Sequence, residues 1–292
     1  MTQATRIHPE LPSNGPLFLR ALFARKEPFH RGAQLPDLAE AIEEVSFAPK
    51  RLARYVELCG FTPGDTLPIT APHVLAAPLH TALLTRPEFP IKALGLIHVS
   101  NRVLQHRAIP TNAPLAIHVG MGHANWVPKG VEFNLMTTVR VDKELAWEEV
   151  STIFWRGEED PSAKKAAPRT AQYQTMSPTL EETWELPGDL GRRYASVSGD
   201  YNPIHLWPWS ARIFGFKRPI IHGMWSLARA ASALEAQLRG DEASIDIHFR
   251  RPIFVPQTVA FEAQQSSGIC SFAAMTPEKG LCFSGQAQAS IS

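Results

Sequence analysis

An internal repeat is the feature of this sequence that most restricts its fold. Three short blocks of the first half recur in the same order in the second half, at shifts between 139 and 151 positions. The paired blocks are residues 54–61 with 193–200, 67–69 with 218–220, and 107–109 with 251–253. Similar blocks in a constant order indicate that one structural unit has been duplicated.

Length and composition agree with two units. The 292 residues suit two domains of roughly 150 residues each. The 29 Lys and Arg nearly balance the 28 Asp and Glu, and the net charge of +1 argues against nucleic acid or a membrane surface as a partner. With 44% apolar and 20% charged residues, the composition is that of a soluble globular protein. The 25 prolines favour short strands and turns over long helices.

Cysteine usage and the N-terminus bear on the compartment. Cys59, Cys270 and Cys282 are odd in number and widely spaced, which predicts reduced packing thiols in a cytosolic protein. No apolar run approaches the ~18 residues of a membrane helix, and the N-terminus lacks a signal-peptide core. The amphipathic segment 17–26 is more typical of a surface or capping helix than of an organelle presequence. We therefore expect a cytoplasmic protein.

A polar segment divides the chain. Residues 156–169 are charged and contain prolines, as interdomain linkers often do. We expect an N-terminal domain over 1–157, a linker over 158–178 and a C-terminal domain over 179–292. Strand-like patterns lie on both sides, over 131–141, 146–155, 244–249 and 281–287.

Each unit follows the same pattern: a short strand, two helices and a run of long antiparallel strands. The second helix of each unit, over 74–84 and 224–234, is apolar. A sheet wrapped around this helix would bury it, so we predict an α+β fold. The sequence has no Gly-rich dinucleotide fingerprint.

The two copies differ most where an active site is expected. Gly60 precedes Pro68 by 8 positions, whereas Gly199 precedes Pro219 by 20. The longer connection contains Asp200 and, five residues on, His205. On an irregular loop fixed by proline, a carboxylate and an imidazole at this spacing can share one water molecule and exchange protons with it.

Gly223 begins the apolar helix of the second unit. Its backbone N–H, at the positive end of the helix dipole, suits a developing oxyanion. By residue type alone, Asp200 and Asn202 are more typical of Asx-turns, His205 of a packed histidine, and Gly223 of close packing. Their joint occurrence in one copy, where the other copy has Phe61 in place of Asp200, favours an active site.

These residues resemble a known signature. The runs YASVSGDYNPIH (194–205), PIIHGM (219–224) and FRRPIFV (249–255) are similar to those of the MaoC-like acyl dehydratases, the (R)-specific enoyl-CoA hydratase family. The resemblance covers about residues 180–290, and the first half resembles the degenerate N-terminal domain of two-domain members. It implies a double hot-dog fold, with two α+β units in one chain.

The resemblance also implies an activity. A hydro-lyase of this family reversibly adds water, in syn fashion, to a trans-2-enoyl thioester of coenzyme A or acyl carrier protein, giving the (R)-3-hydroxyacyl thioester. Asp200 and His205 would activate the water and transfer the C2 proton, and the N–H of Gly223 would hold the thioester oxygen. Asn202 and Pro203 would shape the loop. The reaction needs neither a metal nor a redox cofactor, and coenzyme A or phosphopantetheine is part of the substrate. Whether the chain forms a homodimer is left open by the sequence.

One position departs from the family pattern. A serine eight residues after the glycine often supports the catalytic loop, but this chain has Ala231 there, with Ser232 adjacent and Ser226 nearby. The support of Asp200 is therefore left open by the sequence.

Further residues are candidates for substrate binding. Four basic residues could meet the phosphates of the carrier or form a solvated rim. Four aromatic residues after His205 could line an acyl tunnel, although packing is favoured. His222 and His248 have structural roles by residue type, and His222 is kept as a binding candidate because it precedes Gly223. The binding candidates are Tyr201, Asn202, Lys217, Arg218, His222, Arg250 and Arg251, and the aromatic residues are Trp207, Trp209, Phe214 and Phe216.

The first half has no counterpart of the acid/base pair. Its apolar helix carries Ala76, Ala77 and Ala82, and we expect it to form a wall for a bulky or long acyl chain. Two alternatives stay open, a hot-dog thioester hydrolase and a non-catalytic acyl-thioester-binding subunit of a synthase. The Asp-x-Asn-Pro-x-His run argues against the first, and the intact Asp200/His205 pair argues against the second.

Overall fold

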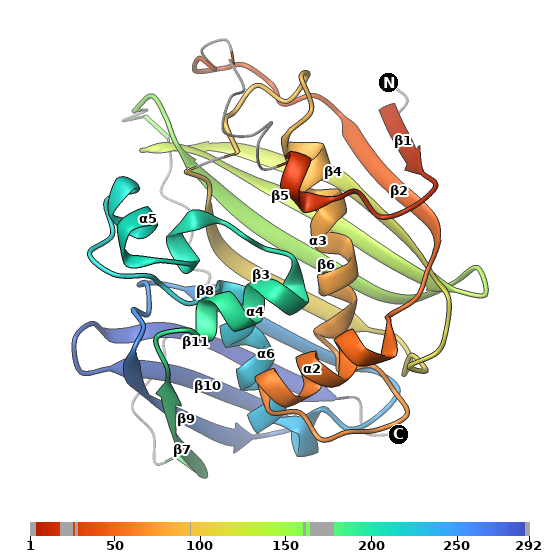
Figure 1. The fold of residues 1–292 in the computed structure, drawn as a ribbon, viewed down its shortest axis with the longest axis vertical. Coiled ribbons are helices and arrows are strands. Elements are labelled where there is room, and N and C mark those ends of the chain that lie inside the picture. Colours follow the sequence, from red (N-terminus) through yellow and green to blue (C-terminus); the bar gives the residue numbers. More distant parts are fainter. Residues whose placement is uncertain are drawn as a thin grey trace.

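A computed structural model describes residues 4–17, 26, 29–93, 95–159, 162–163 and 178–289. Its strands form one sheet in the order β1-β2-β4-β5-β6-β3-β8-β11-β10-β9-β7 (Figure 1). The strands are β1 (Ala4–His8), β2 (Leu38–Val45), β3 (Ile97–Gln105), β4 (Leu115–Val127), β5 (Gly130–Val141), β6 (Glu144–Arg156), β7 (Leu180–Leu186), β8 (Ala243–Phe249), β9 (Gln257–Ser266), β10 (Ile269–Thr276) and β11 (Gly280–Ala289). The strands predicted at 131–141, 146–155, 244–249 and 281–287 are confirmed as β5, β6, β8 and β11.

Helices lie on one face of this sheet, which wraps around them (Figure 1). The predicted apolar helices are confirmed as α3 and α6, and the α+β double hot-dog fold is the observed one. The helices are α2 (Pro49–Cys59), α3 (Ala71–Leu84), α4 (Leu190–Ser198), α5 (Pro208–Ile213) and α6 (Gly223–Ala233), with short 3-10 turns η1 (Pro203–His205) and η2 (Glu235–Leu238).

The repeat predicted from the sequence is visible in the topology. The order β2-β4-β5-β6-β3 of the first unit is matched by β7-β9-β10-β11-β8 of the second. The first unit adds β1 as a parallel edge strand on β2, which the sequence pattern did not predict. The paired helices α2 and α4 both end at a glycine in the left-handed conformation, Gly60 with φ 82° and Gly199 with φ 80°. Only glycine adopts this conformation without steric cost, which explains the matched helix ends.

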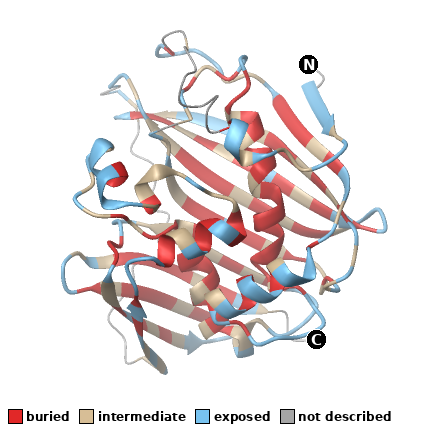
Figure 2. Ribbon diagram, in the orientation of Figure 1, coloured by how far each residue is buried: buried red, intermediate tan, exposed pale blue. Residues whose placement is uncertain are grey.

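The two units share one sheet because β3 pairs with β8. The antiparallel register runs from Ser100 opposite His248 to Gln105 opposite Ala243. Above this seam, the repeat-related tyrosines Tyr55 and Tyr194 lie with ring centroids 6.5 Å apart. Buried residues therefore run without a break across both units (Figure 2).

Some of the predicted segments lie partly outside the residues that the structure describes. Of the predicted linker 158–178, the residues 160–161 and 164–177 lie outside the described part of the chain, as do residues 18–25 of the amphipathic segment 17–26. The three cysteines are free and buried, as predicted for packing thiols. Within the described ranges, no helix is long and apolar enough to cross a membrane.

Gly285 offers a test of the packing within the second unit. A Cβ atom at this position would lie 2.0 Å from the carbonyl oxygen of Asp246 and 2.5 Å from the ring of Phe272, so strand β11 would have to shift. We expect Gly285→Ala to lower the free energy of unfolding by about 2–4 kcal/mol, measured by urea denaturation. Gly64→Ala is the matched control, since no atom lies within 4 Å of the added Cβ. Equal stability of the two variants would contradict this account.

Candidate active site

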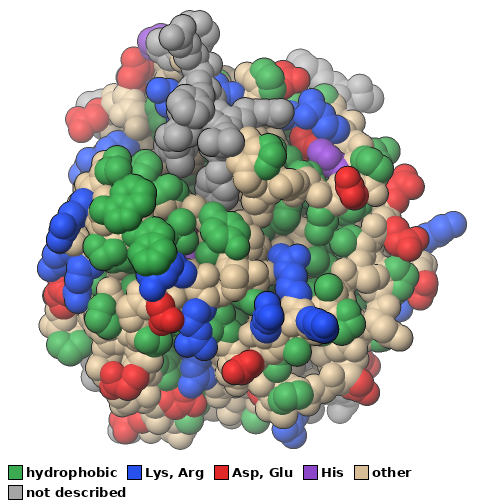
Figure 3. Space-filling view, viewed as in Figure 1, with side chains coloured by type: hydrophobic (Ala, Val, Ile, Leu, Met, Phe, Trp, Pro, Cys, Tyr) green, Lys and Arg blue, Asp and Glu red, His purple; other side chains and the backbone are tan. Residues whose placement is uncertain are grey.

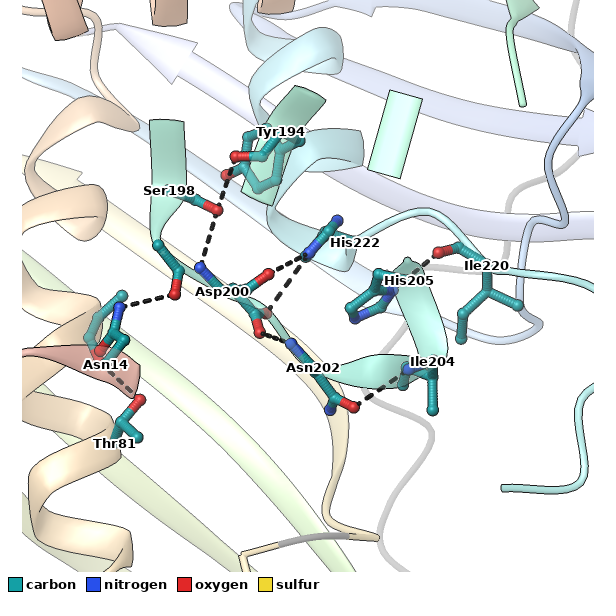
Figure 4. A network of polar contacts seen from close by, with 12 residues as sticks. Asn14, Thr81, Tyr194, Ser198, Asp200, Asn202, Ile204, His205, Ile220 and His222 are labelled. Atoms are coloured by element: carbon teal, nitrogen blue, oxygen red, sulfur yellow. Dashed lines mark hydrogen bonds and ion pairs between the residues drawn. The ribbon is translucent and has the colours of Figure 1, made fainter. Parts of the chain in front are cut away.

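The loop after α4 holds the first candidate carboxylate. Asp200 follows Gly199, and its Oδ1 accepts a hydrogen bond from the backbone N–H of Asn202 at 3.0 Å. Asn202 Oδ1 in turn accepts from the N–H of Ile204 at 3.4 Å, at the start of η1. Both residues therefore form the Asx-turns expected from residue type (Figure 4). The turn fixes Asp200 while 42% of its side-chain surface stays exposed, so the carboxylate can still meet a ligand.

His205 ends η1 and is buried, and its ring is oriented by a backbone carbonyl. Nδ1 donates a hydrogen bond to the carbonyl of Ile220 at 2.7 Å. Ile220 is itself held by a β-bridge to Phe254, so the acceptor has a fixed position. This bond selects the tautomer in which Nε2 carries the lone pair. His205 therefore presents a hydrogen-bond acceptor, and so a potential base, on its other side.

His222, at the N-cap of α6, connects these two residues. Its Nε2 donates to the backbone carbonyl of Asp200 at 2.9 Å and lies 3.8 Å from Oδ2 of the same residue. Its ring stacks on that of His205 with centroids 3.7 Å apart and planes at 28°. Only 2% of the residue is exposed, which places it behind the other two side chains. Its role as a binding residue stays a prediction.

Burial and neighbouring charges set the protonation of this group. Burial alone would raise the pKa of Asp200, but His222, His205 and the N–H of Asn202 together hold it below the usual 3.8. Burial lowers the pKa of His205, against the opposing effects of Asp200 and Ile220. Burial and the nearby His205 lower the pKa of His222 to about 3. At neutral pH the site therefore contains one carboxylate and two neutral imidazoles.

Gly223 is the first residue of α6, as predicted. Its N–H is one of the donors at a helix N-terminus that have no acceptor within the helix. A Cβ atom here would lie 3.0–3.2 Å from three ring atoms of Phe249, so glycine allows the close approach of that ring. A free backbone donor thus directly follows the imidazole that contacts Asp200.

Two residues of the first unit hold the start of the loop. Arg51 of α2 donates from Nε to the carbonyl of Val197 at 2.6 Å and from Nη2 to that of Ser198 at 3.4 Å. Asn14 donates from Nδ2 to the carbonyl of Gly199 at 2.6 Å (Figure 4). Neither residue was found from the sequence, because nothing in their local pattern refers to a loop about 150 or more positions away.

The serines near Ala231 do not support Asp200. Ser226 donates to the carbonyl of His222 at 3.4 Å, and Ser232 donates to that of Cys59 at 2.8 Å. The hydroxyl that does contact Asp200 belongs to Ser198, whose Oγ accepts from the backbone N–H of Asp200 at 3.2 Å. The support left open by the sequence therefore comes from the end of α4 and from the first unit.

Gly191 was also missed. A Cβ atom at this position of α4 would lie 2.1 Å from the carbonyl oxygen of His205, so the helix and η1 meet here backbone to backbone. The close contact brings His205 beneath α4, beside Tyr194 and His222. A glycine in a helix gives no such signal by itself.

The predicted basic residues are only partly gathered. Lys217 and Arg218 both form ion pairs with Glu278. Together with Lys279, their cationic groups lie 5.3–5.4 Å from the ring centroid of Phe254. Glu278 and Lys279 were not singled out from the sequence.

The other binding candidates lie at the surface. Tyr201 is 49% exposed. Arg251 donates from its side chain to the carbonyl of Lys279, and Arg250 donates from its backbone N–H to the carbonyl of Cys282 at 2.8 Å. Contact of these residues with a ligand stays a prediction.

The expectation that the aromatic residues after His205 pack internally is wrong for two of them. Trp207 and Trp209 are 45% and 65% exposed at the start of the short helix α5. Apolar side chains gather on this side of the molecule (Figure 3). The guanidinium of Arg192 lies 3.9 Å from the ring centroid of Trp207 and covers it in place of a core. Phe214 and Phe216 are partly buried.

By distance, two sets of side chains within the described ranges could hold a metal ion. The ligand atoms of Asp200, His205 and His222 lie within 4.8 Å of one another, and so do those of His73, His80 and Glu149. The second set was missed because its members are up to 76 positions apart in the sequence. In both sets, hydrogen bonds already use part of these nitrogen and oxygen atoms.

Comparison with known proteins covers both units. Residues 162–279 match the MaoC like domain. The 3-hydroxyacyl-thioester dehydratase X of Mycobacterium tuberculosis is 30% identical over 257 residues, which is 88% of this chain and 91% of that protein. The chain belongs to the MaoC-like dehydratase family. The crystal structure of HtdX from the same organism superposes with a TM-score of 0.74 at 26% identity and covers 86% of this chain and 100% of its own.

A second relative matches a shorter stretch of this MaoC-like dehydratase. The (R)-specific enoyl-CoA hydratase of Aeromonas caviae is 37% identical over 75 residues, covering 24% of this chain and 55% of that protein. The family resemblance expected from the sequence is therefore confirmed.

The buried histidines predict an acid-sensitive fold. Burial lowers the pKa of His222 and of His80 to about 3, and that of His98 to about 4. Since these values lie below the usual 6.5, the unfolded chain binds the protons first. Stability is thus complete above pH 6.5 and falls as the pH drops toward 4, by roughly 1 kcal/mol per pH unit per histidine. Urea denaturation between pH 4.5 and 8 measures this, with NMR titration of the imidazoles; a flat profile would contradict it.

Proposed function

We propose that this MaoC-like dehydratase is a hydro-lyase that reversibly adds water to a trans-2-enoyl thioester to give the (R)-3-hydroxyacyl thioester. The observation that carries the proposal is the pairing of an ionised, partly exposed Asp200 with a neutral His205 whose Nε2 is an acceptor. A helix N-terminus at Gly223 completes the set of groups that the reaction needs. The names of the relatives, which are dehydratases and hydratases of acyl thioesters, support the same reaction.

The hydration step follows from these groups. Asp200 and His205 hold a water molecule between them, and its oxygen attacks C3 while Nε2 of His205 takes one of its protons. The electron pair of the double bond moves toward the thioester carbonyl, whose oxygen gains negative charge and is held by the N–H of Gly223. The imidazolium of His205 then gives the proton to C2 on the same face. The enzyme returns to its starting state, and the net change is syn addition of water.

Electrostatics favours this division of roles. The carboxylate of Asp200 stays ionised, so it stabilises the transient imidazolium of His205. The stacked ring of His222 and the carbonyl of Ile220 keep His205 in one orientation, so little reorganisation accompanies the proton transfer. In this proposal the step uses only water and protein groups, so it requires no metal or redox cofactor.

The two units divide the work in this proposal. The C-terminal unit, over 179–292, carries the reacting groups, and the N-terminal unit, over 1–157, forms the wall for a bulky or long acyl chain. The cationic groups of Lys217, Arg218 and Lys279 gather around Phe254 and suit the phosphates of coenzyme A or of a phosphopantetheine arm. The exposed Tyr201, which follows Asp200, would contact the substrate in this proposal.

Asp200→Asn and His205→Gln test the acid/base pair. We expect each to lower kcat for enoyl-CoA hydration by about 10²–10⁴-fold, since each removes a group that transfers or stabilises the proton. Asp246→Asn is the matched control, because Asp246 also lies 3.8 Å from a histidine, His248, but on strand β8. The assay follows loss of the enoyl absorbance together with free thiol; thiol release without hydration would identify a hydrolase and contradict the proposal.

Arg51→Ala tests the support of the loop by the first unit. Loss of the hydrogen bonds to Val197 and Ser198 should let the loop move. We expect kcat to fall about tenfold while KM changes little, with partial recovery in Arg51→Lys. Arg54→Ala is the control, because Arg54 lies exposed on the same helix. A tenfold rise in KM with unchanged kcat would instead assign Arg51 to substrate binding.

A further inference from the structure

A second polar group lies inside the N-terminal unit, between α3 and the sheet. His73 Nδ1 donates to Glu149 Oε1 at 2.7 Å, and Asn101 Nδ2 donates to the same oxygen at 2.7 Å. His80 donates from Nε2 to the hydroxyl of Thr137 at 2.8 Å, or accepts from it, and lies 3.8 Å from Glu149 Oε2. The proposed reaction uses none of these side chains. We refer to His73, His80, Asn101 and Glu149 as the α3 polar cluster.

The charge of the α3 polar cluster lies on Glu149. Burial alone would raise the pKa of Glu149, but His73, His80 and the amide of Asn101 lower it to about 2. The carboxylate is therefore ionised, and Nδ1 of His73 donates its proton to it in a hydrogen bond. The other ring nitrogen of His73 is Nε2. Within the described part of the chain, no hydrogen bond involves this atom.

Contacts place His73 beside the catalytic loop. The carbonyl of its neighbour Val74 accepts from Arg51 at 3.4 Å, and the same guanidinium donates to Val197 at the end of α4. His73 is also near enough to Asp200 to be among the groups that lower the pKa of that carboxyl. The side chains of His73 and His80 remain 11% and 10% exposed, whereas that of Glu149 is 0% exposed. The imidazoles, and not the carboxylate, are thus accessible.

A ring contact links the first unit to the oxyanion donor. The ring of His98 on β3 lies 5.2 Å from that of Phe249, which packs on Gly223. A histidine of the first unit is therefore linked through Phe249 to the helix N-terminus at Gly223.

The internal repeat allows the surroundings of Asp200 to be compared with those of Phe61, the related residue of the first unit. There, a cavity of about 750 Å³ is lined by Phe61, Gln105 and Ala231. In the repeat, these correspond to Asp200, Phe249 and His80. Thus the helix wall is an alanine where the acid/base pair is missing and a histidine where the pair is present. The cavity has polar lining elsewhere, for example at Asp65, so the difference between the two sides lies at this one helix position.

Resting on the proposed function, we propose that His73 selects the acyl chain: its Nε2 forms a hydrogen bond with a hydroxyl group that the chain carries beyond the reacting double bond. A plain alkyl chain would bury this nitrogen without a partner, and an unpaired buried polar group is costly. Sites that hydrogen-bond a substrate hydroxyl discriminate strongly against analogues that lack it. The substrate class is thus the hydroxylated 2-enoyl thioesters, in preference to unsubstituted ones.

The test uses a panel of trans-2-enoyl-CoA substrates of one chain length. Each substrate carries a single hydroxyl group on a different carbon from C5 onward, and the plain chain without a hydroxyl is the reference. We expect wild-type kcat/KM to be about tenfold or more higher for one hydroxyl position than for the plain chain. His73→Phe should abolish this ratio and raise kcat/KM for the plain chain. His106→Phe is the matched control, because His106 makes a similar 2.8 Å contact with Glu148 but is one-third exposed. It should leave the ratio unchanged.

The outcomes separate the two proposals. If no enoyl thioester is hydrated, the proposed function fails and the substrate class fails with it. If hydration occurs with equal kcat/KM for plain and hydroxylated chains, the function stands and the role of His73 is overturned. If His73→Phe lowers kcat/KM for plain and hydroxylated chains by the same factor, the role of His73 is also overturned, since a merely structural residue behaves in this way. The wild-type panel decides the question even if His73→Phe does not fold.

Discussion

The pairing of β3 with β8 is the interaction on which the rest of the structure depends. This single antiparallel seam joins the six strands of the first unit to the five of the second in one sheet, and brings α3 of the first unit against α4 of the second. Arg51 can then donate to carbonyls of both helices, at Val74 and at Val197. The loop that carries Asp200 is consequently held by residues of both units, and in the proposed function neither unit alone contains the complete site.

Because the unit is duplicated, residues of both copies can build a single site. The second unit contributes the loop with Asp200 and His205, and the first contributes the supports Arg51 and Asn14 and, in the proposed function, the opposing wall. At the related position on the other side, the short connection after Gly60 leaves Phe61 and a cavity in place of an acid/base pair. A unit without its own loop is free to specialise in holding and selecting a substrate.

Local patterns predicted most of the fold, and the signature loop predicted most of the candidate site. The apolar helices, the paired glycine helix ends and the long strands all follow from residue periodicity and turn chemistry, which act over a few positions. The supports Asn14 and Arg51, the close backbone contact at Gly191 and the pair His73–Glu149 could not be found in this way. Each depends on the packing of one unit against another, or of a helix on a distant strand, which no local pattern encodes. The exposure of Trp207 and Trp209 was missed for the opposite reason, because aromatic residue type favours burial, whereas these rings lie on the short helix α5 at the surface, where Arg192 covers that of Trp207.

Exposure decides what each of the two ionised carboxylates near the seam can do. Asp200 lies beside His205 and His222, and Glu149 lies beside His73 and His80, but the side chain of Asp200 is 42% exposed and that of Glu149 is not exposed at all. In the proposed function, Asp200 therefore acts on a water molecule directly, whereas Glu149 acts only by fixing the orientation of His73. Proton transfer requires the first arrangement, since the charge must follow the moving proton. Discrimination between acyl chains requires the second, since a rigid polar group in a dry wall penalises every chain that does not hydrogen-bond with it.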